Sequence, residues 1–135
     1  MPHVPRPNAV VLRFTPMSPE GVLKRANLDA RRSGGKGHYT ASVWADHAAP
    51  GEGRDDVIRR LLAATELNGL HPERNPHLWW CSSAQKIVEG QFVFEKDEYD
   101  GEPAEHYSVV LGDPPTLEDA QRFVGLFTKE RRPEQ

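Results

Sequence analysis

A glycine-rich segment flanked by basic residues is the part of the chain most suited to binding a phosphate. Its candidate binding residues are Arg31, Arg32, Gly34, Gly35, Lys36, Gly37, His38 and Tyr39. Glycine backbone can present a nest of N–H groups to a phosphate, and the Arg and Lys side chains would add positive charge. The segment is not a P-loop, because the Gly-x4-Gly-Lys-Ser/Thr spacing is absent and the glycines precede a predicted strand. We favour the alternative of a solvated connection between a helix and a strand.

The strand that follows alternates between two kinds of side chain, and its polar face could line a cleft. The residues on that face are His38, Thr40, Ser42, Trp44 and Asp46. In a cleft, Trp44 would stack on a base or a nicotinamide ring. The favoured alternative is the solvent face of an antiparallel sheet, which is normally polar with occasional large residues.

Metal and thiol chemistry have weak support in the sequence. Six histidines are present, but no Cys-x2-Cys or His-Glu-x2-His spacing accompanies them, so we predict no metal site. His38 and His106 would come together only if their strands are neighbours. The single cysteine, Cys81, is interpreted as a buried, inert thiol, because a nucleophilic cysteine needs a nearby base and an electropositive setting.

Two other features suggest an interface with another protein. Trp79 and Trp80 are adjacent in a predicted strand and must point to opposite faces, so one of them is a candidate interface anchor. An acidic run contains the further candidates Glu98, Asp100 and Glu102. A solvated hairpin tip is the default interpretation of this run, and a docking surface for a basic partner is the alternative. The run lacks the spacing of an EF-hand calcium loop.

Hydrophobic periodicity and turn signals predict the elements that position these residues. Strands are predicted at Val10–Phe14, His38–Asp46, Leu78–Cys81 and His106–Leu111. The runs Ile87–Val88 and Phe92–Phe94 are predicted to form either one bulged strand or a tight hairpin.

Three helices are predicted from their caps and apolar stripes. The first begins after Ser18 and buries Val22, Leu23, Ala26 and Ala30. The second spans Arg54–Leu67. The third begins after Thr116, which forms a near-capping box with Asp119, and it buries Leu117, Ala120, Val124 and Phe127.

The predicted order, roughly β-α-β-α-β-β-β-α, indicates a single compact α+β domain. We expect a mostly antiparallel sheet of about four to six strands with about three helices. The domain is assigned to residues 9–128, with a flexible lead-in at 1–8 and a charged, frayed tail at 129–135. A chain of 135 residues is long enough to bury a core without metal or disulfide support.

Composition bounds the cellular setting and the partners. A single cysteine excludes an internally disulfide-stapled scaffold, and no window has the roughly 20 apolar residues of a membrane span. Together with the absence of a signal-like segment, this predicts a cytoplasmic protein that does not bind a membrane. The net charge of −3 argues against sequence-independent binding of nucleic acid.

Three functions remain open, and we favour a small protein-interaction or regulatory factor of immunity, antitoxin-like or operon accessory type. It would bind another protein, with a homodimer as a further possibility, and need no cofactor.

The alternative is a small NAD- or nucleotide-using transferase or toxin. With Arg13 in an early strand, Thr40 and Ser42 on a hydroxyl-rich strand and acids later in the chain, the layout resembles a compact ADP-ribosyltransferase-type domain. In such domains an Arg or His, a Ser/Thr strand and an acid hold NAD. The catalytic candidates that the resemblance implies are Arg13, His38, Ser42 and Glu105. An RNA-binding or RNA-cleaving module, using Arg31, Arg32, Lys36 and Trp44, is the third hypothesis.

Overall fold

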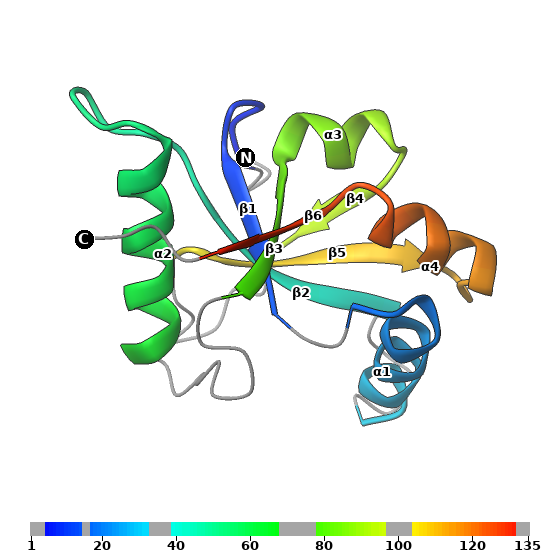
Figure 1. The fold of residues 1–135 in the computed structure, drawn as a ribbon. Coiled ribbons are helices and arrows are strands. Elements are labelled where there is room, and N and C mark those ends of the chain that lie inside the picture. Colours follow the sequence, from blue (N-terminus) through cyan, green and yellow to red (C-terminus); the bar gives the residue numbers. More distant parts are fainter. Residues whose placement is uncertain (1–4, 15–16, 33–38, 68–77, 97–103, 132–135) are drawn as a thin grey trace.

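The computed structural model describes residues 5–14, 17–32, 39–67, 78–96 and 104–131 of the chain (Figure 1). The strands within these residues are β1 (Val10–Arg13), β2 (Tyr39–Asp46), β3 (Leu78–Ser83), β4 (Val93–Glu95), β5 (His106–Gly112) and β6 (Thr128–Arg131). The helices within the same residues are α1 (Pro19–Arg32), α2 (Arg54–Leu67), α3 (Ala84–Glu89) and α4 (Leu117–Val124).

The strands form one sheet in the order β4-β5-β2-β1-β3-β6. Every neighbouring pair is antiparallel, including β1 with β2 and β1 with β3. The predicted α+β class is therefore confirmed, and the six strands of the described residues fall within the predicted range. All four residues of β1 are buried, as expected for a central strand that is covered on both faces.

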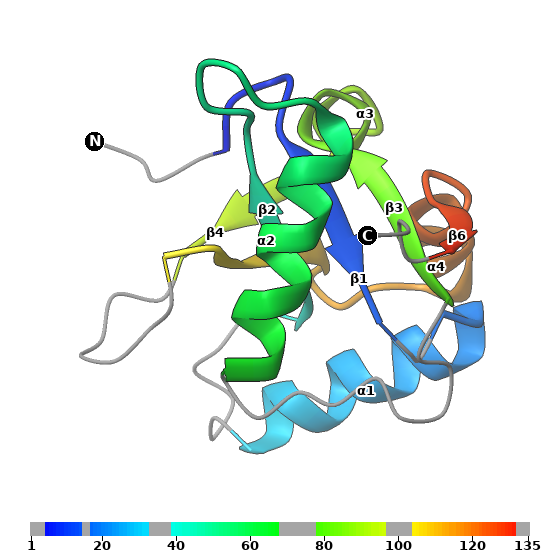
Figure 2. The same cartoon turned by 60° about the vertical axis from the view of Figure 1, so that its left-hand side comes forward.

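Helices cover both faces of the sheet, three on one side and one on the other (Figures 1 and 2). The first core lies beneath α1, α3 and α4, and includes Val22, Ala26, Ile87 and Phe123 packed on strand residues such as Val43. The second core lies beneath α2, and its helix residues are Val57, Ile58, Leu61 and Leu62. The strand residues of the second core are Val10, Leu12, Trp44, Trp79 and Cys81.

Local capping explains where two of the helices begin. The Ser18 hydroxyl accepts a hydrogen bond from the Gly21 N–H at 3.1 Å, at the start of α1. Thr116 and Asp119 form a full capping box at the start of α4. These starts agree with the sequence predictions, and α2 has the predicted bounds. In each case the signal lies within one helical turn, so no distant contact is needed to produce it.

Three local predictions are wrong. Ile87 and Val88 belong to the helix α3, which is capped by the Ser83 hydroxyl, and not to a strand. Lys129 does not begin a frayed tail, because residues up to Arg131 form β6 and pair with β3. The stripe predicted for the last helix is also shifted. Leu117 is 41% exposed, whereas Phe123 is fully buried.

The beginning of the described chain is tied to the fold. The Gln85 N–H donates to the Pro7 carbonyl at 3.0 Å, and the Ala84 N–H donates to the Ala9 carbonyl at 3.1 Å. The predicted lead-in is therefore anchored at Pro7. None of the helices among the described residues combines the length and apolar content needed to cross a membrane.

Candidate functional site

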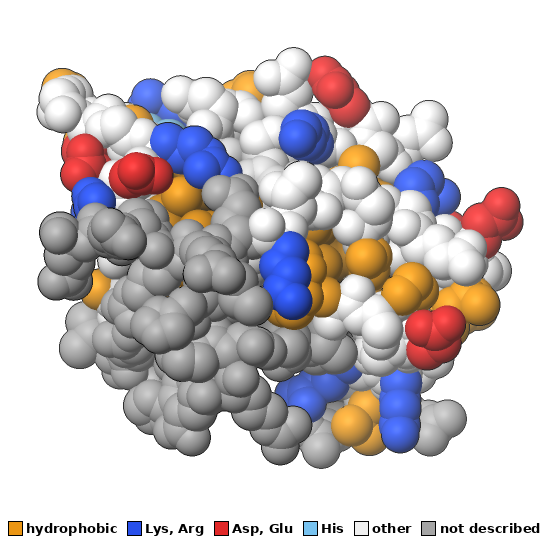
Figure 3. All heavy atoms as spheres, viewed as in Figure 1, with side chains coloured by type: hydrophobic (Ala, Val, Ile, Leu, Met, Phe, Trp, Pro, Cys, Tyr) orange, Lys and Arg blue, Asp and Glu red, His pale blue; other side chains and the backbone are white. Residues whose placement is uncertain are grey.

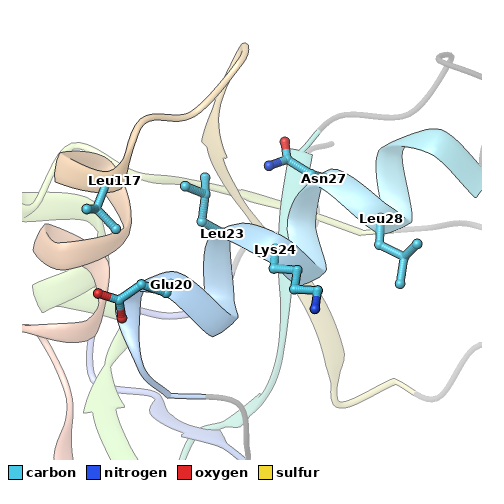
Figure 4. Close-up of a pocket in the computed structure, with 6 residues that line it drawn as sticks. All are labelled: Glu20, Leu23, Lys24, Asn27, Leu28 and Leu117. Carbon is cyan, nitrogen blue, oxygen red and sulfur yellow. The ribbon is translucent and has the colours of Figure 1, made fainter.

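An apolar groove lies along the outer surface of α1, where this helix meets the first turn of α4 (Figure 4). Its volume is about 570 Å³. Its lining residues are Glu20, Leu23, Lys24, Asn27, Leu28 and Leu117. In Figure 4, Leu117 of α4 and Leu23 of α1 point toward each other. We call this feature the α1–α4 groove.

The helical period of α1 explains why two of its leucines are not fully buried. Val22, Ala26 and Ala30 recur every four residues and are buried. Leu23 and Leu28 fall outside that stripe, so the sheet cannot cover them fully. Leu23 is half-buried and Leu28 is 37% exposed. The helix therefore presents leucine side chains to solvent beside its buried stripe.

Leu117 completes the groove because of how α4 begins. The Thr116 hydroxyl accepts a hydrogen bond from the Asp119 N–H at 3.2 Å, and the Asp119 carboxylate accepts one from the Thr116 N–H at 2.8 Å. The backbone hydrogen bond from Thr116 lowers the pKa of Asp119, and further hydrogen bonds and the Arg122 charge act in the same direction. This capping box fixes the first turn of α4, and with it the position of Leu117 at the groove.

Charged residues border the groove unevenly. Glu20 lines it at the start of α1, and Glu118 follows Leu117 in the first turn of α4. Lys24 lines it one helical turn further along α1. Figure 3 shows hydrophobic side chains gathered in the region between α4 and α1, with acidic and basic side chains at the border. The groove thus has an acidic end and a basic side around an apolar centre.

The glycine-rich segment cannot be assessed as a phosphate site. Gly34, Gly35, Lys36, Gly37 and His38 lie outside the described residues, and only the backbone of Arg31 and Arg32 is described. Tyr39 is the first residue of β2, is half-buried and packs against the first core.

The polar face of β2 differs from the predicted solvent face. Trp44 is only 4% exposed, because α2 covers it in the second core. The prediction is wrong at this position, and the buried ring offers no surface on which a base or nicotinamide could stack. Ser42, two residues earlier on the same face, is exposed as predicted. The burial of Trp44 depends on α2, which no local pattern in β2 could reveal.

Of the catalytic candidates of the transferase hypothesis, the structure brings Arg13 and Ser42 together and places Glu105 beside a later part of β2. Arg13 is 5% exposed; its Nη1 donates to the Ser42 carbonyl at 2.6 Å, and its guanidinium lies 5.9 Å from the Phe123 ring centre. Glu105 lies at the other end of the strand pair, where its carbonyl accepts from the Ala45 N–H. Ala45 is three positions after Ser42 in β2, which is roughly 10 Å along a strand. His38 lies outside the described residues.

The residues predicted as interface candidates lie in different surroundings. Trp79 is 1% exposed and lies in the second core, so it is not a surface anchor. Trp80 is half-buried against the first core, and the Lys129 ammonium lies 5.6 Å from its ring centre. Glu98, Asp100 and Glu102 lie outside the described residues. The strands β4 and β5, which precede and follow these residues in the chain, pair antiparallel.

Cys81 and the described histidines do not line the α1–α4 groove. Among the described residues, no group of three or more His, Cys, Asp and Glu side chains could hold a metal ion. His106 pairs with Trp44 at the far end of β2 from Tyr39, and its ring lies edge-on to the Trp44 ring. Cys81 is buried, and its Sγ accepts a hydrogen bond from the Arg54 guanidinium at 3.1 Å.

The sequence does not predict the α1–α4 groove, because the positions of its residues fit other roles. Leu23 and Leu117 were expected to be buried, and Leu28 was not singled out. Leu23 and Leu28 lie about 140° apart around α1, so they form no apolar stripe that would predict the groove. Comparison of the chain with protein-family models, with curated proteins and with solved structures found no match. Inferences about function therefore rest on the groove's own residues.

Proposed function

We propose that this protein is a protein-interaction factor that binds an amphipathic helix of another protein in the α1–α4 groove. The observation that carries the proposal is that Leu23 of α1 and Leu117 of α4 line one open groove, which Leu28 extends along α1. Isolated exposed leucines need no explanation, but leucines that share a groove rimmed by polar residues are typical of binding sites.

The lining favours a protein segment over a small molecule. Small-molecule sites are usually enclosed and place a few polar groups toward one point. Here the polar side chains are Glu20, Lys24 and Asn27. They lie along one helix and are not arranged around a single point. The groove follows α1 from Glu20 to Leu28, which is roughly 12 Å of helix. Two turns of a partner helix, with apolar anchors three or four residues apart, match that length.

The charges at the border specify the partner further. A basic residue of the partner would face Glu20 and Glu118, and an acidic residue would face Lys24. Such complementary charges set the orientation of a bound helix and contribute less to affinity than the buried apolar anchors.

Site-specific crosslinking would identify the partner. A photoreactive amino acid would be placed at Leu28 or Leu117 in the native host, with the same residue at Val88 as the control. Val88 is 54% exposed and lies on α3, outside the groove lining. We expect a crosslinked protein that is common to the two groove positions and absent from the control.

Affinity measurements with the purified partner would then test the groove itself. Leu28→Glu and Leu117→Glu should each weaken binding by about tenfold or more, because a carboxylate would be buried against apolar anchors. Val88→Glu should leave the affinity unchanged. Circular dichroism would confirm that all three variants are folded. Equal affinities for the three variants would refute the proposal.

The acidic run provides a competing test. If the partner docks there instead, the double variant Glu98→Lys/Glu102→Lys should weaken binding at low salt while the groove variants do not. The same partner preparation serves both comparisons.

A further inference from the structure

A second, polar pocket lies at the opposite end of the β2–β5 pair from Gly112, and its volume is about 230 Å³. The residues that matter for its chemistry are Arg6, Asp46, His47, Glu105 and Tyr107. At about 30 Å³ per water molecule, the pocket has room for roughly seven or eight waters. A ligand with a similar number of non-hydrogen atoms would fill it.

The wall formed by Asp46 is held in place by the fold. Arg60 Nη1 donates to Asp46 Oδ2 at 2.7 Å, and the His47 N–H donates to Asp46 Oδ1 at 2.8 Å. Arg60 is itself held by two hydrogen bonds to the Glu52 carboxylate. Asp46 is therefore paired with Arg60 and positioned, which leaves Glu105 as the acid in the pocket without such a partner.

The Glu105 carboxylate and the Tyr107 hydroxyl are available to form hydrogen bonds with a ligand. Among the described residues, neither the Glu105 carboxylate nor the Tyr107 hydroxyl has a side-chain hydrogen-bond partner, although both residues are half-buried. Burial, together with the negative charges of Asp46 and Glu105, raises the pKa of Tyr107. The Lys96 ammonium lies 4.7 Å from the Tyr107 ring centre, and the Tyr107 hydroxyl can still accept a hydrogen bond from a ligand ammonium group.

Arg6, an exposed residue, also lines this pocket. The Ala9 N–H donates to the Arg6 carbonyl at 2.8 Å, and the Pro7 carbonyl is tied to the start of α3. The backbone that carries Arg6 is thus anchored beside the pocket. Its guanidinium is suited to a carboxylate, to which it can donate two parallel hydrogen bonds.

We propose that this pocket binds a small zwitterion, a free amino acid with at most about eight non-hydrogen atoms. The ligand's ammonium group is bound by the Glu105 carboxylate and the Tyr107 hydroxyl. Its carboxylate is bound by Arg6. A simple amine would leave Arg6 unused, and a simple carboxylate would face Glu105 without a compensating charge.

A nuclear magnetic resonance titration of the full chain tests this assignment. The probes are glycine, β-alanine and 4-aminobutyrate, which separate the two charges by increasing lengths. The matched controls are n-propylamine and propionate, which each carry one charge only. We expect at least one zwitterion to shift the Glu105, Tyr107 and Arg6 signals saturably, with a Kd about tenfold or more below that of either control.

Variants decide whether the named residues bind the ligand. Glu105→Gln, Arg6→Gln and Tyr107→Phe should each weaken the best zwitterion by about tenfold, an effect typical of losing one charge-assisted contact. Glu89→Gln and Lys86→Gln, at exposed positions away from this pocket, should have no effect. The proposal is wrong if no zwitterion binds saturably. It is also wrong if n-propylamine binds as tightly, or if the pocket variants behave like the controls. None of these readouts depends on the α1–α4 groove.

Discussion

Arg60 of α2 donates two hydrogen bonds to the Glu52 carboxylate, from Nε to Oε2 at 2.8 Å and from Nη2 to Oε1 at 2.7 Å. This bidentate pair fixes the loop before α2 against the helix. The same guanidinium also reaches Asp46 at the end of β2. One side chain therefore connects a helix, a loop and a strand.

The Arg60 pair predicts an acid-dependent contribution to stability. Hydrogen bonds, first from Arg60 and then from the Ala49 N–H, lower the pKa of Glu52 below its ordinary value of 4.5. A carboxylate with a lowered folded pKa stabilises the protein above its unfolded pKa, and this contribution is lost as the pH falls through the folded pKa.

Arg60→Gln should therefore lower the midpoint of urea unfolding more at about pH 7 than at about pH 3. Lys86→Gln, which removes an exposed positive charge from α3, is the control for net charge. If Arg60→Gln lowered the midpoint of urea unfolding equally at both pH values, the prediction would be contradicted.

The capping box of α4 predicts a loss of stability when its hydroxyl is removed. Thr116→Ala should lower the free energy of unfolding by about 1 kcal/mol, because the Asp119 N–H loses its acceptor. Thr116→Ser keeps the hydroxyl, so its free energy of unfolding should stay close to that of the wild type. Equilibrium unfolding in urea measures both variants, and equal losses for the two would exclude a role for the hydroxyl.

Gly112 and Gly53 form a matched pair for the effect of an added methyl group. A Cβ on Gly112 would lie 2.8 Å from Pro115 Cα, whereas a Cβ on Gly53 would have its nearest neighbour at 3.9 Å. Gly112→Ala should cost about 1–3 kcal/mol of stability, because backbone must shift to relieve the contact. Gly53→Ala should cost much less. Calorimetric unfolding would compare the two, and a similar cost for both would show that the loop after β5 yields easily.

The two adjacent tryptophans predict unequal costs of truncation. Trp79 is 1% exposed and lies beneath α2, whereas Trp80 is half-buried on the other face of the sheet. Trp79→Ala should lower the free energy of unfolding by about 3–5 kcal/mol through the cavity it leaves. Trp80→Ala should lower it by clearly less. If Trp80→Ala proved the more costly in urea unfolding, the assignment of the two faces would be wrong.

Local signals were sufficient to predict much of the fold. The bounds of α2 follow from an apolar stripe with acids in its first turn, and the start of α4 follows from Thr116 and Asp119. The alternation of β2 correctly predicts that Ala41, Val43 and Ala45 share a buried face. Helix caps and side-chain periodicity depend on residues within one or two turns, so they can be read without knowing the neighbours.

Short segments were harder to predict, because their pattern fits more than one element. Ile87 and Val88 are β-branched and suggest a strand, yet they lie in the six-residue helix α3. Ser83 provides the cap of that helix, and Ile87 is fully buried in the first core. In a run this short, tertiary packing outweighs intrinsic propensity.

The sequence by itself determined the α+β class, most helix starts and the buried face of β2. Only the tertiary structure decided which faces are covered. Trp44 is buried because α2 packs on it, and the α1–α4 groove exists because the first turn of α4 brings Leu117 beside Leu23. Periodicity identifies the faces of an element, but burial depends on which distant element packs there. The candidate sites are formed by such distant neighbours, so they could not be read from local patterns.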